Sequence, residues 1–127
     1  MKNKILVVDD EPQIREMYSQ AFSMAGYTVE TAASAEEALE MMQNNSYKVL
    51  FLDLNLPGMN GVELCRQISV GWPTAICYAV TGYSSVFELL DCREAGFEDY
   101  FTKPVSISVM IEAAGHAFKK LERWKSK

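Results

Sequence analysis

Short apolar runs alternate with segments of helical periodicity along the whole chain. The runs have strand length and predict strands at residues 4–8, 27–32, 48–54, 74–80 and 97–101. After each run, apolar residues recur every three or four positions, at residues 12–25, 35–42, 62–70, 86–90 and 107–121. Five such strand–helix units predict a parallel sheet with helices on both faces, because right-handed crossovers place them there.

Residues at the ends of these segments support the predicted bounds. Pro12 is tolerated in a first helical turn, and Gly26 is suited to the position just after a helix ends. Ser34 fits an N-cap, with a glutamate three residues later as in a capping box. Either Ser84 or Ser85 is expected to cap the fourth helix in the same way.

The chain is expected to form a single α/β domain. Its 127 residues suffice for one hydrophobic core, and the sequence contains no repeat or low-complexity linker. We expect residues 1–122 to form the body of the domain and residues 123–127 a basic tail. In open sheets of this kind, ligands bind beyond the carboxyl ends of the strands, so that edge is where a site is expected.

Composition and charge narrow the classes of function. Twelve basic against 17 acidic side chains give a net charge of −5, which argues against a nucleic-acid or anionic-membrane binder. No apolar run is long enough to span a bilayer or act as a signal peptide, so a cytoplasmic protein is expected. The three cysteines form no CxxC pair and are expected as reduced thiols in apolar surroundings.

Polar residues end four of the predicted strands. Asp9 and Asp10 stand at the end of the first, Asp53 at the end of the third and Thr81 at the end of the fourth, and Lys103 follows the fifth. Each residue alone has an ordinary explanation as a cap or surface group, but together they bring three carboxylates to one edge. Oxygen ligands without histidine or thiolate suit a hard cation such as Mg²⁺. With a lysine and a hydroxyl nearby, the set indicates phosphoryl transfer, with Asp53 as the candidate nucleophile because it ends the most apolar strand.

Four blocks of sequence carry a resemblance to a known family. The segments "ILVVDDE", "LFLDLNLPGMNG", "YAVTGYSS" and "DYFTKP" resemble, in order and spacing, the signature blocks of the response-regulator receiver domain of two-component signalling. The resemblance covers the whole chain. It implies a doubly wound, CheY-like (flavodoxin-like) sheet of five strands in the order 2-1-3-4-5.

The resemblance also implies a role for each strand-end residue. Asp53 would accept a phosphoryl group from a histidine of a sensor kinase or phosphotransfer protein. Asp10 and Asp53 would bind Mg²⁺ (or Mn²⁺) directly, Asp9 mainly through water, and the backbone carbonyl of Asn55 would complete the protein ligands. Lys103 would pair with a phosphoryl oxygen.

Further positions match the family's conformational switch. Thr81 and Tyr100 occupy the two switch positions, and the peptide bond between Lys103 and Pro104 matches a bond that is cis in the family. Phosphorylation would reshape the face formed by the fourth helix, fifth strand and fifth helix. Through that face the chain would regulate an unknown partner, as a monomer or a phosphorylation-dependent dimer, without contacting nucleic acid or membrane.

Two positions are expected to tune how long the phosphoryl group persists. Asn55 and Tyr83 each lie two residues after a site residue, where side chains can flank the path of an attacking water. An aromatic ring at Tyr83 is expected to shield the acyl phosphate and slow its hydrolysis. The chain would thus promote its own phosphorylation and dephosphorylation without being an enzyme for a separate substrate.

Two other classes of function remain as alternatives. A small phosphatase of the haloacid-dehalogenase type also uses a strand-end aspartate, but it carries that residue on its first strand and needs a cap for which this chain has no room. A flavin carrier shares the fold, but the acidic edge would repel an anionic cofactor. Whether the chain acts alone or is a piece of a longer regulator or hybrid kinase is left open.

Overall fold

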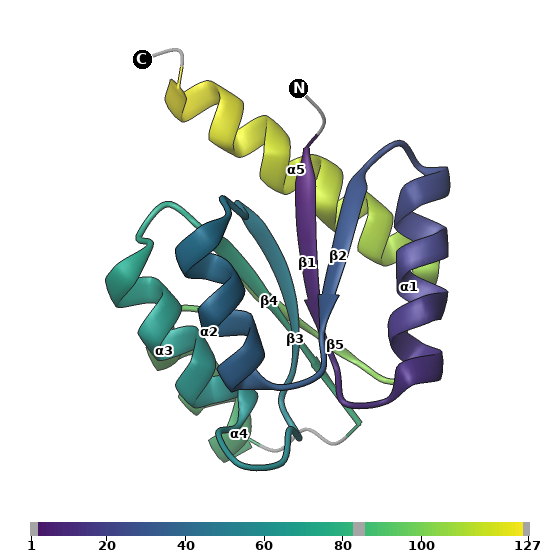
Figure 1. The fold of residues 1–127 in the computed structure, drawn as a ribbon. Coiled ribbons are helices and arrows are strands. Elements are labelled where there is room, and N and C mark those ends of the chain that lie inside the picture. Colours follow the sequence, from purple (N-terminus) through teal and green to yellow (C-terminus); the bar gives the residue numbers. More distant parts are fainter. Residues whose placement is uncertain (1–2, 83–85, 126–127) are drawn as a thin grey trace.

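A computed structural model describes residues 3–82 and 86–125 of the chain (Figure 1). Strands and helices alternate strictly from the N-terminus to the C-terminus, as the hydrophobic pattern predicts. The elements are β1 (Lys4–Val8), α1 (Pro12–Met24), β2 (Thr28–Ala32), α2 (Ala35–Asn44), β3 (Val49–Asp53), α3 (Gly61–Gly71), β4 (Ile76–Thr81), α4 (Val86–Ala95), β5 (Asp99–Thr102) and α5 (Ile107–Lys125).

The strands form one parallel sheet in the order β2-β1-β3-β4-β5, which confirms the expected doubly wound fold. Val8, the last residue of β1, pairs with the residue before Asp53. Asp53 itself pairs with Val80, and Thr81 pairs with Thr102. This register brings the carboxyl ends of four strands to the same edge of the sheet.

The helices cover the sheet in two layers (Figure 1). Helices α1 and α5 lie on one face, and α2, α3 and α4 lie on the other. Strand β3 shows why both faces are apolar, because successive residues of a strand point to opposite sides. Leu50 and Leu52 pack against the α2 and α3 side, whereas Val49 and Phe51 pack against the α1 and α5 side. The ring of Phe51 stacks on that of Tyr78 with centroids 5.1 Å apart.

Local signals set the ends of the first two helices as predicted. Helix α1 begins at Pro12, and Gly26 follows it with a φ of 99°, a left-handed conformation that glycine adopts readily. The Ser34 hydroxyl accepts the N–H of Glu37 at 3.1 Å, and the Glu37 carboxylate accepts the N–H of Ala33 at 2.6 Å. The pair resembles the predicted capping box, but Glu37 accepts the N–H of the residue before the N-cap instead of that of the N-cap itself. The expected cap at Ser84 or Ser85 lies outside the described residues.

Three expectations from the hydrophobic pattern need correction. Strand β4 begins at Ile76 rather than at residue 74, and β5 begins at Asp99 rather than at residue 97. Phe97 closes α4 instead, because its N–H bonds to the Cys92 carbonyl at 3.1 Å. Met17, on the predicted buried face of α1, is 43 % exposed.

The three cysteines are buried and free, which confirms their assignment as core thiols. No helix within residues 3–82 and 86–125 is both long and apolar enough to cross a membrane. Residues 123–125, at the start of the expected tail, form the exposed last turn of α5.

Candidate functional site

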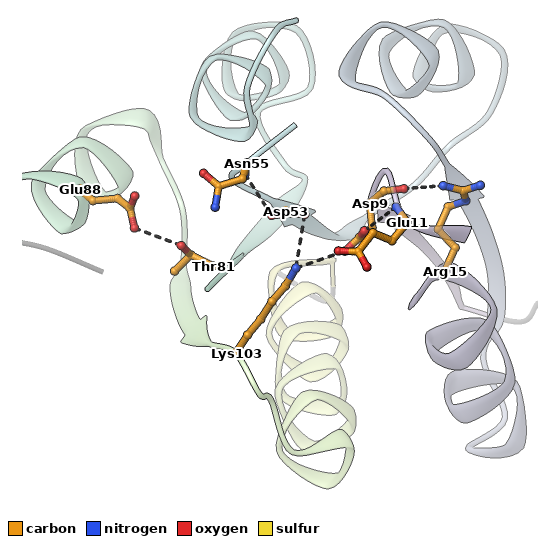
Figure 2. Close-up of polar contacts among 8 residues, drawn as sticks. All are labelled: Asp9, Glu11, Arg15, Asp53, Asn55, Thr81, Glu88 and Lys103. Carbon is orange, nitrogen blue, oxygen red and sulfur yellow. Dashed lines mark hydrogen bonds and ion pairs between the residues drawn. The ribbon is translucent and has the colours of Figure 1, made fainter. Parts of the chain in front are cut away.

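The polar residues predicted from the strand ends lie at one edge of the sheet, where Figure 2 shows Asp9, Asp53, Thr81 and Lys103. Asp9 and Asp10 follow β1, Asp53 ends β3, Thr81 ends β4 and Lys103 follows β5. They converge because strands in parallel register end at the same level, although the chain separates them widely. The region where the strand order reverses, between β1 and β3, therefore carries three carboxylates.

The carboxylates of Asp9, Asp10 and Asp53 lie close enough to repel one another strongly. Each offers one oxygen, and these oxygens all lie within 4.8 Å of one another. Asp9 and Asp53 are only 2 % and 4 % exposed, whereas Asp10 is exposed to solvent. For charges within 4.8 Å of each other and an effective dielectric constant of about 20, the repulsion between the two buried charges is at least about 3.5 kcal/mol.

Lys103 offsets part of this repulsion. Its Nζ lies 3.4 Å from Asp53 Oδ2 and 3.6 Å from Asp9 Oδ2, contacts that bridge β5 to both β3 and β1. At the same dielectric constant each attraction is about 4.5 to 5 kcal/mol. The peptide bond that follows, between Lys103 and Pro104, is cis. One lysine facing three carboxylates leaves the site with excess negative charge.

Backbone N–H groups orient the two buried carboxylates. The Glu11 N–H donates to Asp9 Oδ1 at 2.9 Å, and the Asn55 N–H donates to Asp53 Oδ1 at 3.0 Å. Both are aspartate turns that bond the backbone two residues later. With each Oδ1 held in this way, each Oδ2 is left to face Lys103.

Burial and neighbouring charge shift the proton affinities of the site. The pKa of Asp9 is raised, first by burial and further by the charge of Asp53, which together outweigh the Glu11 N–H and Lys103. Burial alone would lower the pKa of Lys103, but the charges of Asp53 and Asp9 raise it overall. A further cation at this edge would act in the opposite direction and favour the ionised form of Asp9.

The donor set fits a hard divalent cation. The ligand atoms of Asp9, Asp10 and Asp53 are all carboxylate oxygens, and among the described residues no other cluster of acidic, histidine or cysteine side chains meets the same criterion. Mg²⁺ and Mn²⁺ prefer oxygen ligands of this kind. Asn55 lies in the loop directly after β3, where its carbonyl is available as a further oxygen.

The two residues at the predicted switch positions, Thr81 and Tyr100, differ in burial. Thr81 is buried and donates its hydroxyl to Glu88 Oε1 of α4 at 3.2 Å. Tyr100 lies on β5 and is 39 % exposed. Tyr83, the second residue expected to tune phosphate lifetime, lies outside the described residues.

Sequence reasoning missed two residues that contact the site. The Arg15 guanidinium donates to the Asp9 carbonyl at 2.8 Å and so holds the loop between β1 and α1 (Figure 2). Glu88 meets Thr81 from the first turn of α4. The sequence signal for Arg15 is only its position one helical turn inside α1. The signal for Glu88 is its acidic charge near a helix N-terminus, and the helix dipole alone accounts for an acidic residue there.

Comparison with known proteins agrees with the geometry. The family model for the response regulator receiver domain matches residues 5–115. The response regulator MprA of Mycobacterium ulcerans is 36 % identical over 111 residues, which cover 87 % of this chain and 48 % of MprA. A cyclic di-GMP phosphodiesterase of Thermotoga maritima is 31 % identical over 115 residues, or 91 % of this chain and 31 % of that protein. The chain thus spans half or less of these relatives.

Solved structures show the same fold over nearly the whole chain. A CheY-like receiver domain protein from Methanospirillum hungatei JF-1 has a TM-score of 0.93 and 31 % identity, covering 97 % of this chain and 98 % of that one. The BeF₃-activated DrrB receiver domain has a TM-score of 0.86 and 29 % identity, covering 94 % and 99 %. The chain therefore belongs to the response regulator receiver domains, the phosphorylation-dependent signalling modules of two-component systems.

Proposed function

We propose that Asp53 is the residue of this receiver that accepts the phosphoryl group, from a phosphohistidine on a sensor kinase or phosphotransfer protein. The observation that carries the proposal is the placement of Asp53 on the central strand β3, 4 % exposed, with Lys103 Nζ 3.4 Å from its Oδ2. Its strand lies between β1, which Asp9 follows, and β4, which Thr81 ends. A phosphoryl group on Asp53 would therefore be within reach of groups on both sides.

The transfer needs alignment and charge neutralisation more than covalent chemistry. A carboxylate oxygen of Asp53 attacks phosphorus, so that an O–P bond forms while the N–P bond of the donor breaks. The electron pair of that bond stays on the donor's imidazole nitrogen. Lys103 then pairs with a phosphoryl oxygen, as a compact point charge suited to that role.

A divalent cation would complete the charge balance. Asp10 and Asp53 would hold Mg²⁺ (or Mn²⁺) directly, with Asp9 through water and the carbonyl of Asn55 as a further ligand. When bound, the ion neutralises charge on the phosphoryl oxygens. The three clustered carboxylates support this assignment.

The output of the switch is proposed to be a change in the face formed by α4, β5 and α5. The Thr81 hydroxyl would turn to a phosphoryl oxygen, and the ring of Tyr100 would move into the space vacated. Each of the three elements carries an exposed apolar side chain, Leu90 at 53 %, Tyr100 at 39 % and Val109 at 47 %. These side chains provide apolar contacts for a partner protein or for a second copy of the chain.

We further propose that the chain regulates by contact and does not turn over a separate substrate. Asn55 and Tyr83 would then set the lifetime of the signal by flanking the water that hydrolyses the acyl phosphate. Replacing Tyr83 with glutamate should shorten that lifetime. An unchanged or longer lifetime would contradict this role.

Labelling with a small phosphodonor tests the assignment of Asp53. The protein is incubated with Mg²⁺ and acetyl phosphate, and the modified residue is located by peptide mass mapping. We expect one phosphoryl group on Asp53 and none in Asp53→Asn. The matched control is Asp99→Asn, which removes an exposed carboxylate from the start of β5 and should label like wild type. Label on another residue, or undiminished labelling of Asp53→Asn, would refute the proposal.

A further inference from the structure

The Thr81 hydroxyl is already engaged from α4 before any phosphoryl group is present. Thr81 ends β4 with 1 % of its surface exposed, and its Oγ1 donates to Glu88 Oε1 at 3.2 Å. Figure 2 shows the Glu88 side chain reaching from its helix to the strand end. This contact ties the first turn of α4 to the edge of the sheet where the proposed chemistry occurs.

The hydroxyl of Thr81 can serve only one strong acceptor at a time. It carries a single proton, whereas the Glu88 carboxylate and a phosphoryl oxygen are both anionic acceptors. A bond from Thr81 to a phosphoryl group therefore requires the bond to Glu88 to break. Repulsion between the two anions also opposes their sharing one hydroxyl.

The Glu88 side chain borders open space between α3 and α4. Glu88 lines a cavity of about 540 Å³ between α3 and α4, and Arg66 of α3 lines the same cavity. In the part of the chain that the structure describes, Arg66 forms no ion pair. The cavity thus offers space to a carboxylate that leaves Thr81, and it is lined by one cation, Arg66, together with the carboxylates of Glu63 and Asp91.

We propose that Glu88 is a positioning residue that holds Thr81 and the first turn of α4 in the unphosphorylated arrangement, and yields the hydroxyl when Asp53 is phosphorylated. The inference rests on the proposed function of Asp53 and Thr81, and it adds the competing acceptor. Part of the free energy gained when Thr81 binds the phosphoryl group is used to break the bond between Thr81 and Glu88. Glu88 therefore sets how readily phosphorylation changes the position of α4.

The proposal predicts the effect of removing the competitor. A ligand that needs the released hydroxyl binds only those molecules in which the hydroxyl is available. Its apparent affinity is the intrinsic affinity multiplied by the fraction of such molecules. Glu88→Ala should tighten the binding of beryllofluoride, a stable mimic of the phosphoryl group, by about five- to tenfold, since a hydrogen bond to a charged group is lost. Glu88→Gln keeps a neutral acceptor and should tighten it by about two- to threefold.

The experiment titrates beryllofluoride into the Mg²⁺-loaded full chain and follows backbone amide resonances by NMR. The matched control is Asp91→Ala, because Asp91 lies on the same helix and lines the same cavity. It should change the affinity by less than about twofold, since no hydrogen bond to Thr81 is lost. In a Thr81→Ala background, Glu88→Ala should have a much smaller effect on the affinity, because the bond between the two residues is already lost.

A second measurement reads the contact without any phosphoryl mimic. The methyl resonance of Thr81 should shift in Glu88→Ala, shift less in Glu88→Gln and stay in place in Asp91→Ala. If wild type binds beryllofluoride and Glu88→Ala binds it no more tightly, Glu88 does not compete for Thr81 and the inference is wrong. If wild type does not bind beryllofluoride at Asp53, the proposed function itself fails, and the methyl shift still reports separately on the contact.

Discussion

Replacing Asp9 with asparagine tests which electrostatic effect governs the carboxylate cluster. Asparagine has nearly the same shape and keeps an oxygen to accept the Glu11 N–H, which bonds Asp9 Oδ1 at 2.9 Å. The substitution therefore removes charge with little change in packing. It abolishes the repulsion from Asp53 and the attraction to Lys103 together.

These two effects oppose each other and are of similar size. At an effective dielectric constant of about 20, the repulsion between oxygens within 4.8 Å of each other is at least about 3.5 kcal/mol, and the attraction at 3.6 Å is about 4.6 kcal/mol. What remains is the cost of burying a carboxylate that is only 2 % exposed, which is also the largest cause of the raised pKa of Asp9. We expect Asp9→Asn without metal to be more stable than wild type by about 1–2 kcal/mol.

Magnesium should reduce or reverse this advantage. An ion present at about 100 times its dissociation constant stabilises the folded protein by about 2.7 kcal/mol. Asp9→Asn has one charged group fewer at the site, so it should gain less from the same concentration of Mg²⁺. The stability difference seen without metal should then shrink or change sign.

Urea unfolding in EDTA and in Mg²⁺ measures both effects. Glu40→Gln on α2 is the control, because it removes an exposed carboxylate and changes the net charge equally. A lower stability of Asp9→Asn in EDTA would show that attraction to Lys103 outweighs burial. If Mg²⁺ increased the stability of Asp9→Asn and wild type equally, Asp9 would not contribute to metal binding.

Three further substitutions, with Gly71→Ala as the control for the first, test the packing, ionisation and helix capping of the fold that carries the site. In Gly61→Ala the new Cβ would lie 2.3 Å from the Asp53 carbonyl oxygen, so the backbone must shift; we expect a loss of about 2–3 kcal/mol in urea unfolding and weaker labelling with acetyl phosphate. Gly71→Ala meets no atom within 4 Å and should be neutral or stabilising, so an equal loss there would contradict the steric argument. Burial raises the pKa of Tyr78 to about 12, above its unfolded value near 10. The stability that this shift represents is complete below about pH 10 and is lost as the pH rises toward 12, so Tyr78→Phe should flatten the fall in stability across that range; an unchanged pH profile would refute this. Ser34→Ala removes the cap of α2 and should cost about 1 kcal/mol by urea unfolding, while an unchanged stability would show that the cap bond contributes nothing.

The architecture could be predicted because it depends on local periodicities that are combined by a general rule. Runs such as 49–53 are apolar on both faces, as a central parallel strand must be, and the right-handed crossover then places the helices. The pattern defines the bounds of the strands and helices less sharply, because an apolar residue between two elements can belong to either of them. Phe97 closes α4 rather than opening β5, and only its hydrogen bond to Cys92 shows this.

Exposure was harder to predict than periodicity. Met17 has the spacing of a buried residue, yet it is 43 % exposed. Apolar spacing identifies which side of a helix faces the protein core. How much of that side is buried depends on how much of the helix surface the neighbouring elements cover. That coverage is a property of the packed layers and is absent from a local pattern.

The sequence by itself determined which residues reach the carboxyl edge, since Asp9, Asp53, Thr81 and Lys103 stand at strand ends and parallel strands end together. Only the tertiary structure decided that Asp9 is buried while its neighbour Asp10 is exposed, because the two residues differ in the direction of their side chains and not in chemistry. It alone also decided that Glu88 bonds Thr81. That contact depends on the angle at which a helix packs against a sheet, which arises from all the side chains between them.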